Sequence, residues 1–201
     1  MLTKKFKNKS FKGSFYKIII TGLEGGHSGL SIDKSRANAV KLLARLLKAL
    51  KDKMKFDLAY IKCGEEVNTI AKCSEAIINI KDSYKKIIEN ILDNLQQIFN
   101  SEYKFDTNIR IYIRKIDKNL KVYKDEITNK LINLIYLLPQ GVNQKSKEFI
   151  QASSNISKVF EKDNNINFKV DLRSSKESFK KYLKYKIQCI SNIIDCELKF
   201  D

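Results

Sequence analysis

Apolar residues recur along the first part of the chain with two spacings, one typical of strands and one of helices. The clearest alternation lies in 108–116, where isoleucines alternate with arginine and tyrosine. The clearest helical spacing lies in 33–52, for which Ser31 or Asp33 is the expected N-cap. The pattern predicts six elements in the order strand, helix, strand, strand, helix, strand: 15–23, 33–52, 56–62, 71–80, 81–99 and 108–116.

This order is that of a split βαβ unit, in which an antiparallel sheet carries two helices on one face. We therefore expect an α+β fold, an antiparallel sheet of seven to eight strands with four helices on one face. Two ferredoxin-like halves, at about 13–117 and 118–201, would share this sheet within a single domain of residues 1–201. The second half repeats the pattern in part, with helices at 124–138 and 175–193 and strands near 150–160, 167–172 and 196–200.

The composition is that of an ordinary globular protein. The apolar fraction is 43%, enough for a buried core, and no apolar run is long enough to cross a membrane. The basic N-terminal residues are not followed by an apolar signal core, so we expect a cytosolic protein. The cysteines lack Cys-x-x-Cys spacing, which favours buried reduced thiols over disulfides or a metal site: Cys63, Cys73, Cys189 and Cys196.

The formal net charge of +16 suggests an acidic partner, because a positive field attracts nucleic acid without sequence preference. The excess is mostly lysine spread along the whole chain, whereas base recognition favours the planar fork of arginine. No aromatic RNA-binding motif or helix-turn-helix pattern stands out. Nucleic acid is therefore the less favoured partner. The alternative function is that of a non-catalytic basic module, which would bind nucleic acid or another acidic partner.

The one histidine of the chain lies in a glycine-rich turn, residues 22–29, between the first predicted strand and the first predicted helix. Small neighbours leave its ring free, so His27 is a candidate donor to a developing negative charge; the alternative is a turn residue that hydrogen-bonds locally. Ser28 is not a credible nucleophile, because the chain has no second histidine to act as its base. The turn also lacks the lysine and serine or threonine that end a phosphate-binding loop.

Two further residues are candidates for substrate binding. Arg173 follows the strand predicted at 167–172, and a guanidinium at a strand end can hold a carboxylate through two hydrogen bonds. An ion pair with Asp171 explains this arginine equally well. Asn68 lies in a loop and could donate to a peptide carbonyl, although asparagine more often forms turns.

Residues 22–29, together with 32–39 (IDKSRANA) and 41–47 (KLLARLL), closely resemble the aminoacyl-histidine dipeptidases, cytosolic zinc-dependent peptidases related to carnosinases and peptidase T. The resemblance is to the lid, or dimerisation, domain that interrupts the catalytic domain of these enzymes. Weaker similarity covers nearly the whole chain, through 68–70, 138–142, 154–155 and 171–175.

The resemblance implies roles for three residues. In these enzymes a lid histidine stabilises the oxyanion of the tetrahedral intermediate, an arginine binds the substrate carboxylate and an asparagine contacts the substrate. By motif, these roles fall on His27, Arg173 and Asn68. The Ile-Pro-Arg that follows the asparagine in the family is Ile70-Ala71-Lys72 here.

The resemblance also implies partners: a dipeptide substrate, a second copy of the chain in a homodimer, no membrane, and a catalytic domain that holds zinc. The zinc ligands and the general-base glutamate of the family have no counterpart in this chain. We therefore expect no cofactor in the chain itself and no dipeptide hydrolysis by it alone, because nothing in it would activate water at neutral pH.

Overall fold

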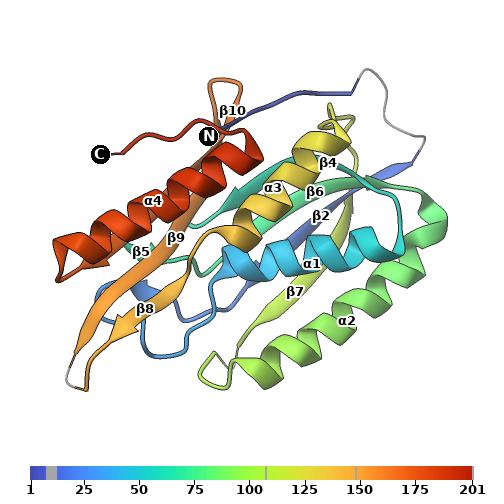
Figure 1. Cartoon of the computed structure of the whole chain (residues 1–201). Coiled ribbons are helices and arrows are strands. Elements are labelled where there is room, and N and C mark those ends of the chain that lie inside the picture. The colour runs from blue at the N-terminus through green and yellow to red at the C-terminus, as the bar shows by residue number, and fades with distance from the viewer. Residues whose placement is uncertain (8–12, 107, 148, 201) are drawn as a thin grey trace.

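The computed structural model describes residues 1–7, 13–106, 108–147 and 149–200. Its main element is an eight-stranded antiparallel sheet with the order β1, β10, β9, β4, β6, β2, β7, in which β8 also pairs with β9. Figure 1 shows the four helices over one face of this sheet. The strands are β1 (Leu2–Thr3), β2 (Ser14–Thr21), β3 (Gly26–His27), β4 (Asp57–Cys63), β5 (Thr69–Ile70), β6 (Ser74–Ile80), β7 (Arg110–Ile116), β8 (Gly141–Lys145), β9 (Ile150–Lys162) and β10 (Asn165–Ser174). The helices are α1 (Ala39–Lys53), α2 (Lys85–Glu102), which follows a 3-10 turn (Asp82–Tyr84), α3 (Asp125–Leu137) and α4 (Glu177–Ile194).

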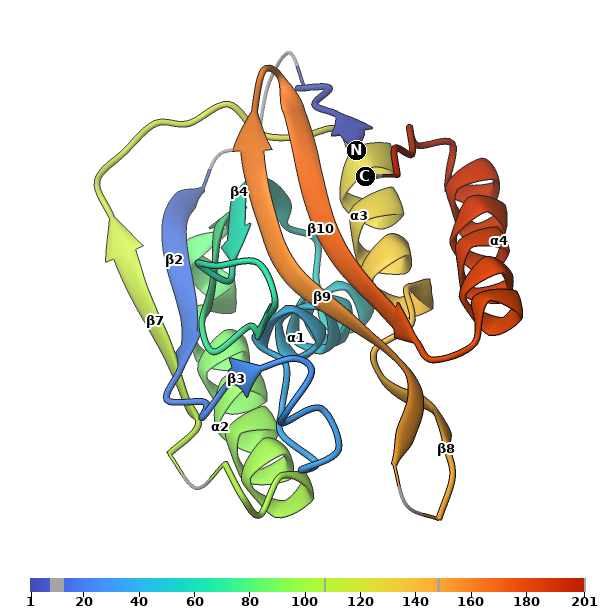
Figure 2. The same ribbon diagram turned by 90° about the vertical axis from the view of Figure 1, so that its left-hand side faces the viewer.

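The helices form one layer in the order α2, α1, α3, α4, since α1 contacts both α2 and α3, and α3 contacts α4. Figure 2 shows this layer from the side, with the strands curving past it. Eight of the fifteen residues of α1 are buried, compared with four of eighteen in α2. Fully buried isoleucines of β2 and β6, such as Ile18, Ile20 and Ile78, belong to the same apolar core. The centre of the core therefore lies between α1 and the sheet.

The split βαβ unit predicted from the sequence is present as β2, α1, β4, β6, α2 and β7, with the sheet order β4, β6, β2, β7. In its register, Ile18 of β2 lies opposite Ile113 of β7 and Ala76 of β6. The alternation on β7 separates its two faces: Ile113 packs against the core, whereas Tyr112 is exposed. The predicted α+β class, the antiparallel sheet and the four helices on one face are confirmed.

The rest of the chain repeats this pattern in part, as α3, the hairpin of β9 and β10, and α4. The two parts share one sheet where β4 meets β9, through the pair Cys63 and Val159. Gly64, at this junction, has a φ of +65°, and a β carbon there would lie 2.0 Å from the carbonyl oxygen of Ser157. Only glycine fits so close an approach. The division into halves near residue 117 stays a prediction.

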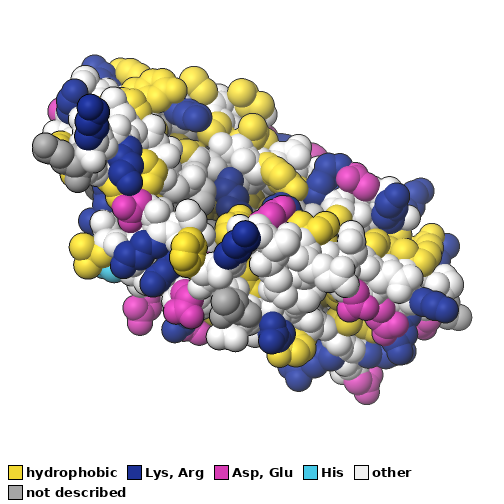
Figure 3. Space-filling model, turned by 90° about the horizontal axis from the view of Figure 1, so that it is seen from below, with side chains coloured by type: hydrophobic (Ala, Val, Ile, Leu, Met, Phe, Trp, Pro, Cys, Tyr) yellow, Lys and Arg dark blue, Asp and Glu magenta, His cyan; other side chains and the backbone are white. Residues whose placement is uncertain are grey.

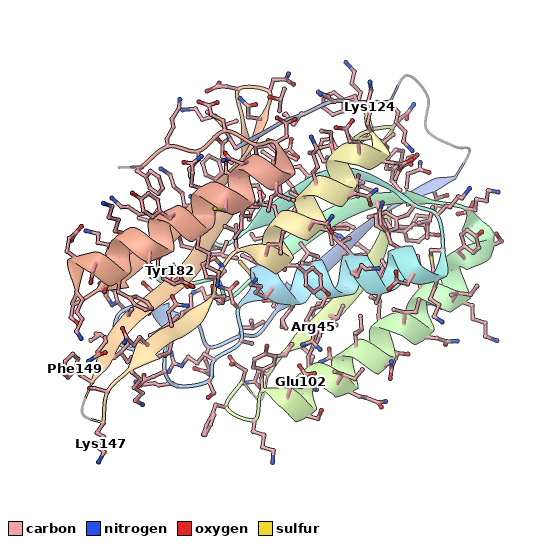
Figure 4. The ribbon with its side chains drawn as sticks, in the orientation of Figure 1. Arg45, Glu102, Lys124, Lys147, Phe149 and Tyr182 are labelled. Atoms are coloured by element: carbon pink, nitrogen blue, oxygen red, sulfur yellow. The ribbon has the colours of Figure 1, made fainter. Side chains whose placement is uncertain are left out.

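Polar side chains on α1 join it to both neighbouring helices. Arg45 forms a two-pronged ion pair with Glu102 of α2, in which Nη2 lies 2.8 Å from Oε1 (Figure 4). Lys41 Nζ donates to three carbonyl oxygens at the end of α3, at 2.5 to 3.1 Å. Burial lowers the pKa of Lys41 to about 8.

The first helix begins later than predicted. The residue that caps α1 is Asn38, whose Oδ1 accepts from the backbone N–H of Val40 at 2.9 Å; neither Ser31 nor Asp33 does so. The preceding residues form a loop instead, because the N–H of Ala37 is bonded to the buried carboxylate of Asp106. A loop that is tied to a distant residue cannot be recognised from local spacing.

The strand predicted at 196–200 is wrong, because these residues form no strand. The N–H of Cys196 donates to the carbonyl oxygen of Ser191, and Ser191 Oγ donates to the carbonyl oxygen of Cys196 at 2.5 Å. The segment therefore closes the end of α4 rather than extending the sheet. The sequence pattern also missed β1, β3, β5 and β8, which have two to five residues each and are too short to show alternation.

The prediction of buried cysteines holds only for Cys63, because Cys73 and Cys196 are partly exposed and Cys189 is exposed. Burial raises the pKa of Cys63 well above its ordinary value. None of the helices in the part of the chain that the structure describes has both the length and the apolar character needed to cross a membrane.

Candidate functional site

The loop from β2 to α1, residues 22–38, carries the only histidine. Three of its glycines have positive φ angles, +82° at Gly22, +62° at Gly25 and +112° at Gly26. At Gly22 a β carbon would lie 1.8 Å from the carbonyl oxygen of Asn108. The first glycine is therefore needed both for its backbone conformation and for its close contact with the chain before β7.

A buried carboxylate holds this loop against the core. Asp106 is fully buried, and its two oxygens accept from the backbone N–H groups of Glu24 and Ala37, each at 2.7 Å. Arg36 adds a hydrogen bond from Nη1 to the carbonyl oxygen of Gly25. The loop is thus tied down near both of its ends, and the residues between them can project outward from a fixed base.

His27 lies on β3, which pairs with β5 in a separate two-stranded ladder. In this ladder His27 is opposite Thr69, and the N–H of Ser28 donates to the carbonyl oxygen of Asn68 at 2.8 Å. Asn68 is exposed and has a φ of +60°, the left-handed conformation that asparagine tolerates. The predicted candidates His27 and Asn68 are therefore close together, His27 on β3 and Asn68 in the turn immediately before β5.

The ring of His27 is exposed and its orientation is set by one local hydrogen bond. Its Nδ1 accepts from the backbone N–H of Gly29 at 3.2 Å. A neutral imidazole that accepts at Nδ1 carries its proton on Nε2. The arrangement therefore presents an N–H donor to the solvent side of the loop. Ser28 is buried beside it, and its Oγ has no hydrogen-bond partner among the described residues.

Arg173 lies near the end of β10, opposite Ser153 of β9. It is exposed, and within the described ranges no carboxylate forms an ion pair with it. Asp171, the partner considered from the sequence, instead accepts from Asn155 Nδ2 at 3.1 Å. The guanidinium is thus available to an anion from outside the chain.

His27 and Arg173 meet at Gly29. A β carbon at Gly29 would lie 3.0 Å from Arg173 Nη1 and 3.2 Å from His27 Cε1. The missing side chain of this glycine therefore leaves room for the guanidinium beside the imidazole. A pocket at this place is lined mainly by residues of the hairpin: Gly29, Ile150, Gln151, Ala152, Ser153, Arg173, Ser174 and Ser175.

Residues 17–107 match the family model of the peptidase dimerisation domain. The chain contains a peptidase dimerisation domain. It is 28% identical over 174 residues to the cytosol non-specific dipeptidase of Escherichia coli (strain K12), a match that covers 84% of this chain and 36% of that protein. Its fold matches the crystal structure of the aminoacylhistidine dipeptidase from Vibrio alginolyticus with a TM-score of 0.95 and 19% identity, over 100% of this chain and 42% of that one. The chain thus spans about two fifths of the length of these relatives.

The resemblance to the dipeptidase lid domain is confirmed by these matches. In the structure, segments that carry the resemblance come together although they are far apart in the sequence. The glycine-rich turn contacts 68–70 through the β3 and β5 ladder, and Arg173 adjoins it at Gly29. The roles of His27, Arg173 and Asn68 in a reaction stay predictions.

Three residues that hold the site together had no role predicted from the sequence: Asp106, Asn155 and Gln140. Asp106 lies outside every motif of the resemblance, and only the structure shows that it bonds to the loop. Asn155 and Gln140 lie within motifs of the resemblance, which could have drawn attention to them, but their bonds cross between distant strands and turns. Long-range polar contacts of this kind leave no local signal in a sequence.

Among the described residues, no group of three His, Cys, Asp or Glu side chains is close enough to hold a metal ion. The basic residues of the chain are distributed rather than gathered. Figure 3 shows lysines and arginines mixed with acidic side chains over one face of the molecule, without a continuous basic stripe. The binding of nucleic acid or another acidic partner stays the alternative prediction.

Proposed function

We propose that this chain is the lid domain of a zinc-dependent cytosolic dipeptidase of the aminoacyl-histidine type. The lid would close over a bound dipeptide and supply His27 and Arg173 to it. The observation that carries the proposal is the meeting of these two side chains at Gly29, where a donor and a cation lie side by side on the surface. A dipeptide offers a carbonyl oxygen and a terminal carboxylate at a similarly short separation.

His27 would stabilise the negative charge that develops on the carbonyl oxygen when water attacks the peptide bond. The hydrogen bond from Gly29 to Nδ1 leaves Nε2 as the donor, so the neutral ring needs no change of tautomer to act. A donor that is already oriented costs no reorganisation during the reaction, and such donors are worth about 3 kcal/mol. His27 would not act as a nucleophile or as a metal ligand.

Arg173 would bind the C-terminal carboxylate of the dipeptide through two parallel hydrogen bonds. The absence of an ion pair with a described carboxylate leaves its charge available for this role. Asn68 would donate a further hydrogen bond to the substrate from the turn before β5. Serines of the same pocket offer additional hydroxyl groups around the carboxylate.

The partners follow from the same proposal. The described residues offer no cluster of ligands for zinc, so the metal and the activated water would belong to a separate catalytic domain, the partner that this proposal requires. A second copy of the chain would complete a homodimer, and sedimentation of the purified protein would measure it. The name of the Escherichia coli relative supports a cytosolic location.

A chimeric enzyme tests the proposal. In it, this chain replaces the corresponding domain of the Vibrio alginolyticus enzyme, whose fold it matches. We expect the chimera to hydrolyse a histidine-containing dipeptide. His27→Ala is expected to lower kcat by about 100-fold to 1000-fold, as for the loss of an oxyanion donor. Arg173→Lys is expected mainly to raise KM, because lysine cannot form the two-pronged contact.

The matched control is Lys34→Ala, which removes an exposed side chain from the same loop and should leave both kinetic constants unchanged. Unaltered turnover in the His27→Ala chimera would rule out the role of this histidine. A salt-sensitive complex with an oligonucleotide would instead favour the basic binding module.

A further inference from the structure

We propose that Asn155 is a positioning residue that joins the β3 and β5 ladder, which carries His27, to the strand that carries Arg173, so that the two side chains move as one unit. The proposal rests on the proposed function for the roles of His27 and Arg173. The hydrogen bonds from which it is argued do not depend on those roles. It concerns one buried amide, whose four hydrogen bonds go to groups other than the imidazole and the guanidinium.

Asn155 lies in β9, is 2% exposed, and uses its whole hydrogen-bonding capacity. A side-chain amide has two N–H groups and two acceptor positions on its oxygen. Here Nδ2 donates to the carbonyl oxygen of Thr69 at 2.8 Å and to Asp171 Oδ2 at 3.1 Å. Oδ1 accepts from Asn38 Nδ2 and from Gln140 Nε2, each at 3.3 Å. A fully saturated amide has one favoured orientation.

The first of these bonds leads to His27. The carbonyl oxygen that it holds belongs to Thr69, the residue opposite His27 in the β3 and β5 ladder. That ladder has only two residue pairs, and the hydrogen bond from Ser28 to Asn68 is its immediate neighbour. A ladder so short is marginal by itself. The bond from Asn155 to β5 is therefore a long-range anchor for the ladder that presents the histidine.

The second bond leads to Arg173. Asp171 and Arg173 are two residues apart on β10, so their side chains lie on the same face of the strand. Asp171 accepts from Asn155 through Oδ2 and, among the described residues, forms no ion pair with the arginine two residues away. The bond therefore restrains β10 and holds one oxygen of this carboxylate toward β9.

The two hydrogen bonds that Asn155 Oδ1 accepts fix the position of the amide, because both donors are held in place by other contacts. Asn38 caps α1, and Gln140 lies in the turn before β8, where its Oε1 also accepts from the N–H of Ile156 at 2.8 Å. Both donors are thus held by other elements. An aspartate of the same shape could keep these two acceptor contacts but could not donate to Thr69 or Asp171.

The experiment compares Asn155→Asp and Asn155→Ser in this chain. The readouts are the hydrogen-exchange rate of the Ser28 amide and the nitrogen NMR signals of the one imidazole. In both variants we expect the Ser28 amide to exchange at least tenfold faster relative to the core amide of Leu43. The His27 nitrogens should move toward values averaged over the two tautomers. Asn155→Ser is neutral and smaller, so it carries the test if the charged variant does not fold.

Asn167→Asp is the matched control, because it makes the same chemical change at the far end of the same hairpin. It should leave both readouts as in the unchanged chain. Unaltered Ser28 exchange and imidazole signals in the two Asn155 variants would overturn the proposal. Neither readout requires hydrolysis, so inactivity of the chimera would count against the proposed function and leave this coupling standing.

Discussion

The two side chains of the candidate site are held in different ways. His27 belongs to a loop of irregular backbone, which depends on glycines with positive φ angles and on the buried carboxylate of Asp106. Arg173 belongs to a long hairpin, in which β9 and β10 pair over ten residues with one shift of register. The hairpin is positioned by its own backbone ladder, whereas the loop is positioned by residues far away in the sequence.

This difference means that the loop should be the more fragile of the two regions. In a hairpin, the loss of one side chain leaves the neighbouring backbone bonds in place. In the loop, one carboxylate satisfies two backbone N–H groups that have no other partner in the described part of the chain. Substitutions that remove long-range contacts should therefore affect the loop strongly and the hairpin little.

The largest effect on stability is expected for Asp106→Ala. This change leaves the N–H groups of Glu24 and Ala37 without their acceptor, and hydrogen bonds to a charged group are worth about 1.5 to 3 kcal/mol each. We expect the free energy of unfolding to fall by about 3 to 5 kcal/mol, measured by denaturant titration.

The control for this change is Asp93→Ala, which removes an exposed carboxylate from α2 and should alter stability by less than about 0.5 kcal/mol. If both variants unfolded at the same denaturant concentration, the loop would not depend on the buried carboxylate, and the contrast with the hairpin would disappear.

The next largest loss of stability is expected for an alanine substitution at Gly22, and a glycine of similar backbone conformation, Gly141, serves as its comparison. Gly22 has a φ of +82°, and a β carbon there would lie 1.8 Å from a backbone oxygen. Gly141, the first residue of β8, has a φ of +98° but nothing within 4 Å of the same position. Gly22→Ala should cost about 2 to 3 kcal/mol, and Gly141→Ala about 1 kcal/mol from the backbone alone. Thermal unfolding of the two variants measures this difference, and equal losses would contradict it.

The same contrast explains how much could be predicted from the sequence. Elements with a regular period were found, such as the strand at 108–116 and the helix at 124–138, because local spacing decides which face is buried. The start of α1 was missed because its cap, Asn38, and the bond from Ala37 to Asp106 depend on contacts across the fold. The candidate residues came from motifs, but the meeting of His27 and Arg173 at Gly29 could not be read from their spacing.

A smaller loss of stability is expected for substitution of Lys41, which joins α1 to the end of α3. Lys41→Met removes three hydrogen bonds but also relieves the desolvation of a charge, so we expect a loss of about 1 to 2 kcal/mol at pH 7. Lys48→Met, on the exposed face of the same helix, is the control and should change stability by less than about 0.5 kcal/mol.

The difference in stability between the unchanged protein and Lys41→Met should depend on pH, and the sign of this dependence follows from the pKa of Lys41. Burial lowers the pKa of Lys41 in the folded protein to about 8, from an ordinary value of 10.5. Between these two values the unfolded chain binds more protons than the folded one, so the contribution of Lys41 to stability rises with pH. The stability gap between the unchanged protein and Lys41→Met should therefore widen from pH 7 to pH 9.5. A gap that stayed constant or narrowed would mean that the ammonium is not desolvated.

The smallest effect on stability is expected at the two candidate residues themselves. His27 and Arg173 are exposed, and among the described residues Arg173 has no carboxylate partner, so His27→Ala and Arg173→Ala should each change the free energy of unfolding by less than about 0.5 kcal/mol. In the chimera the same two variants should lose most of the activity. Loss of activity without loss of stability would show that these side chains serve the substrate rather than the fold. A drop of several kcal/mol at Arg173 would mean that the hairpin end depends on its guanidinium, and the contrast between a self-supporting hairpin and an anchored loop would no longer hold.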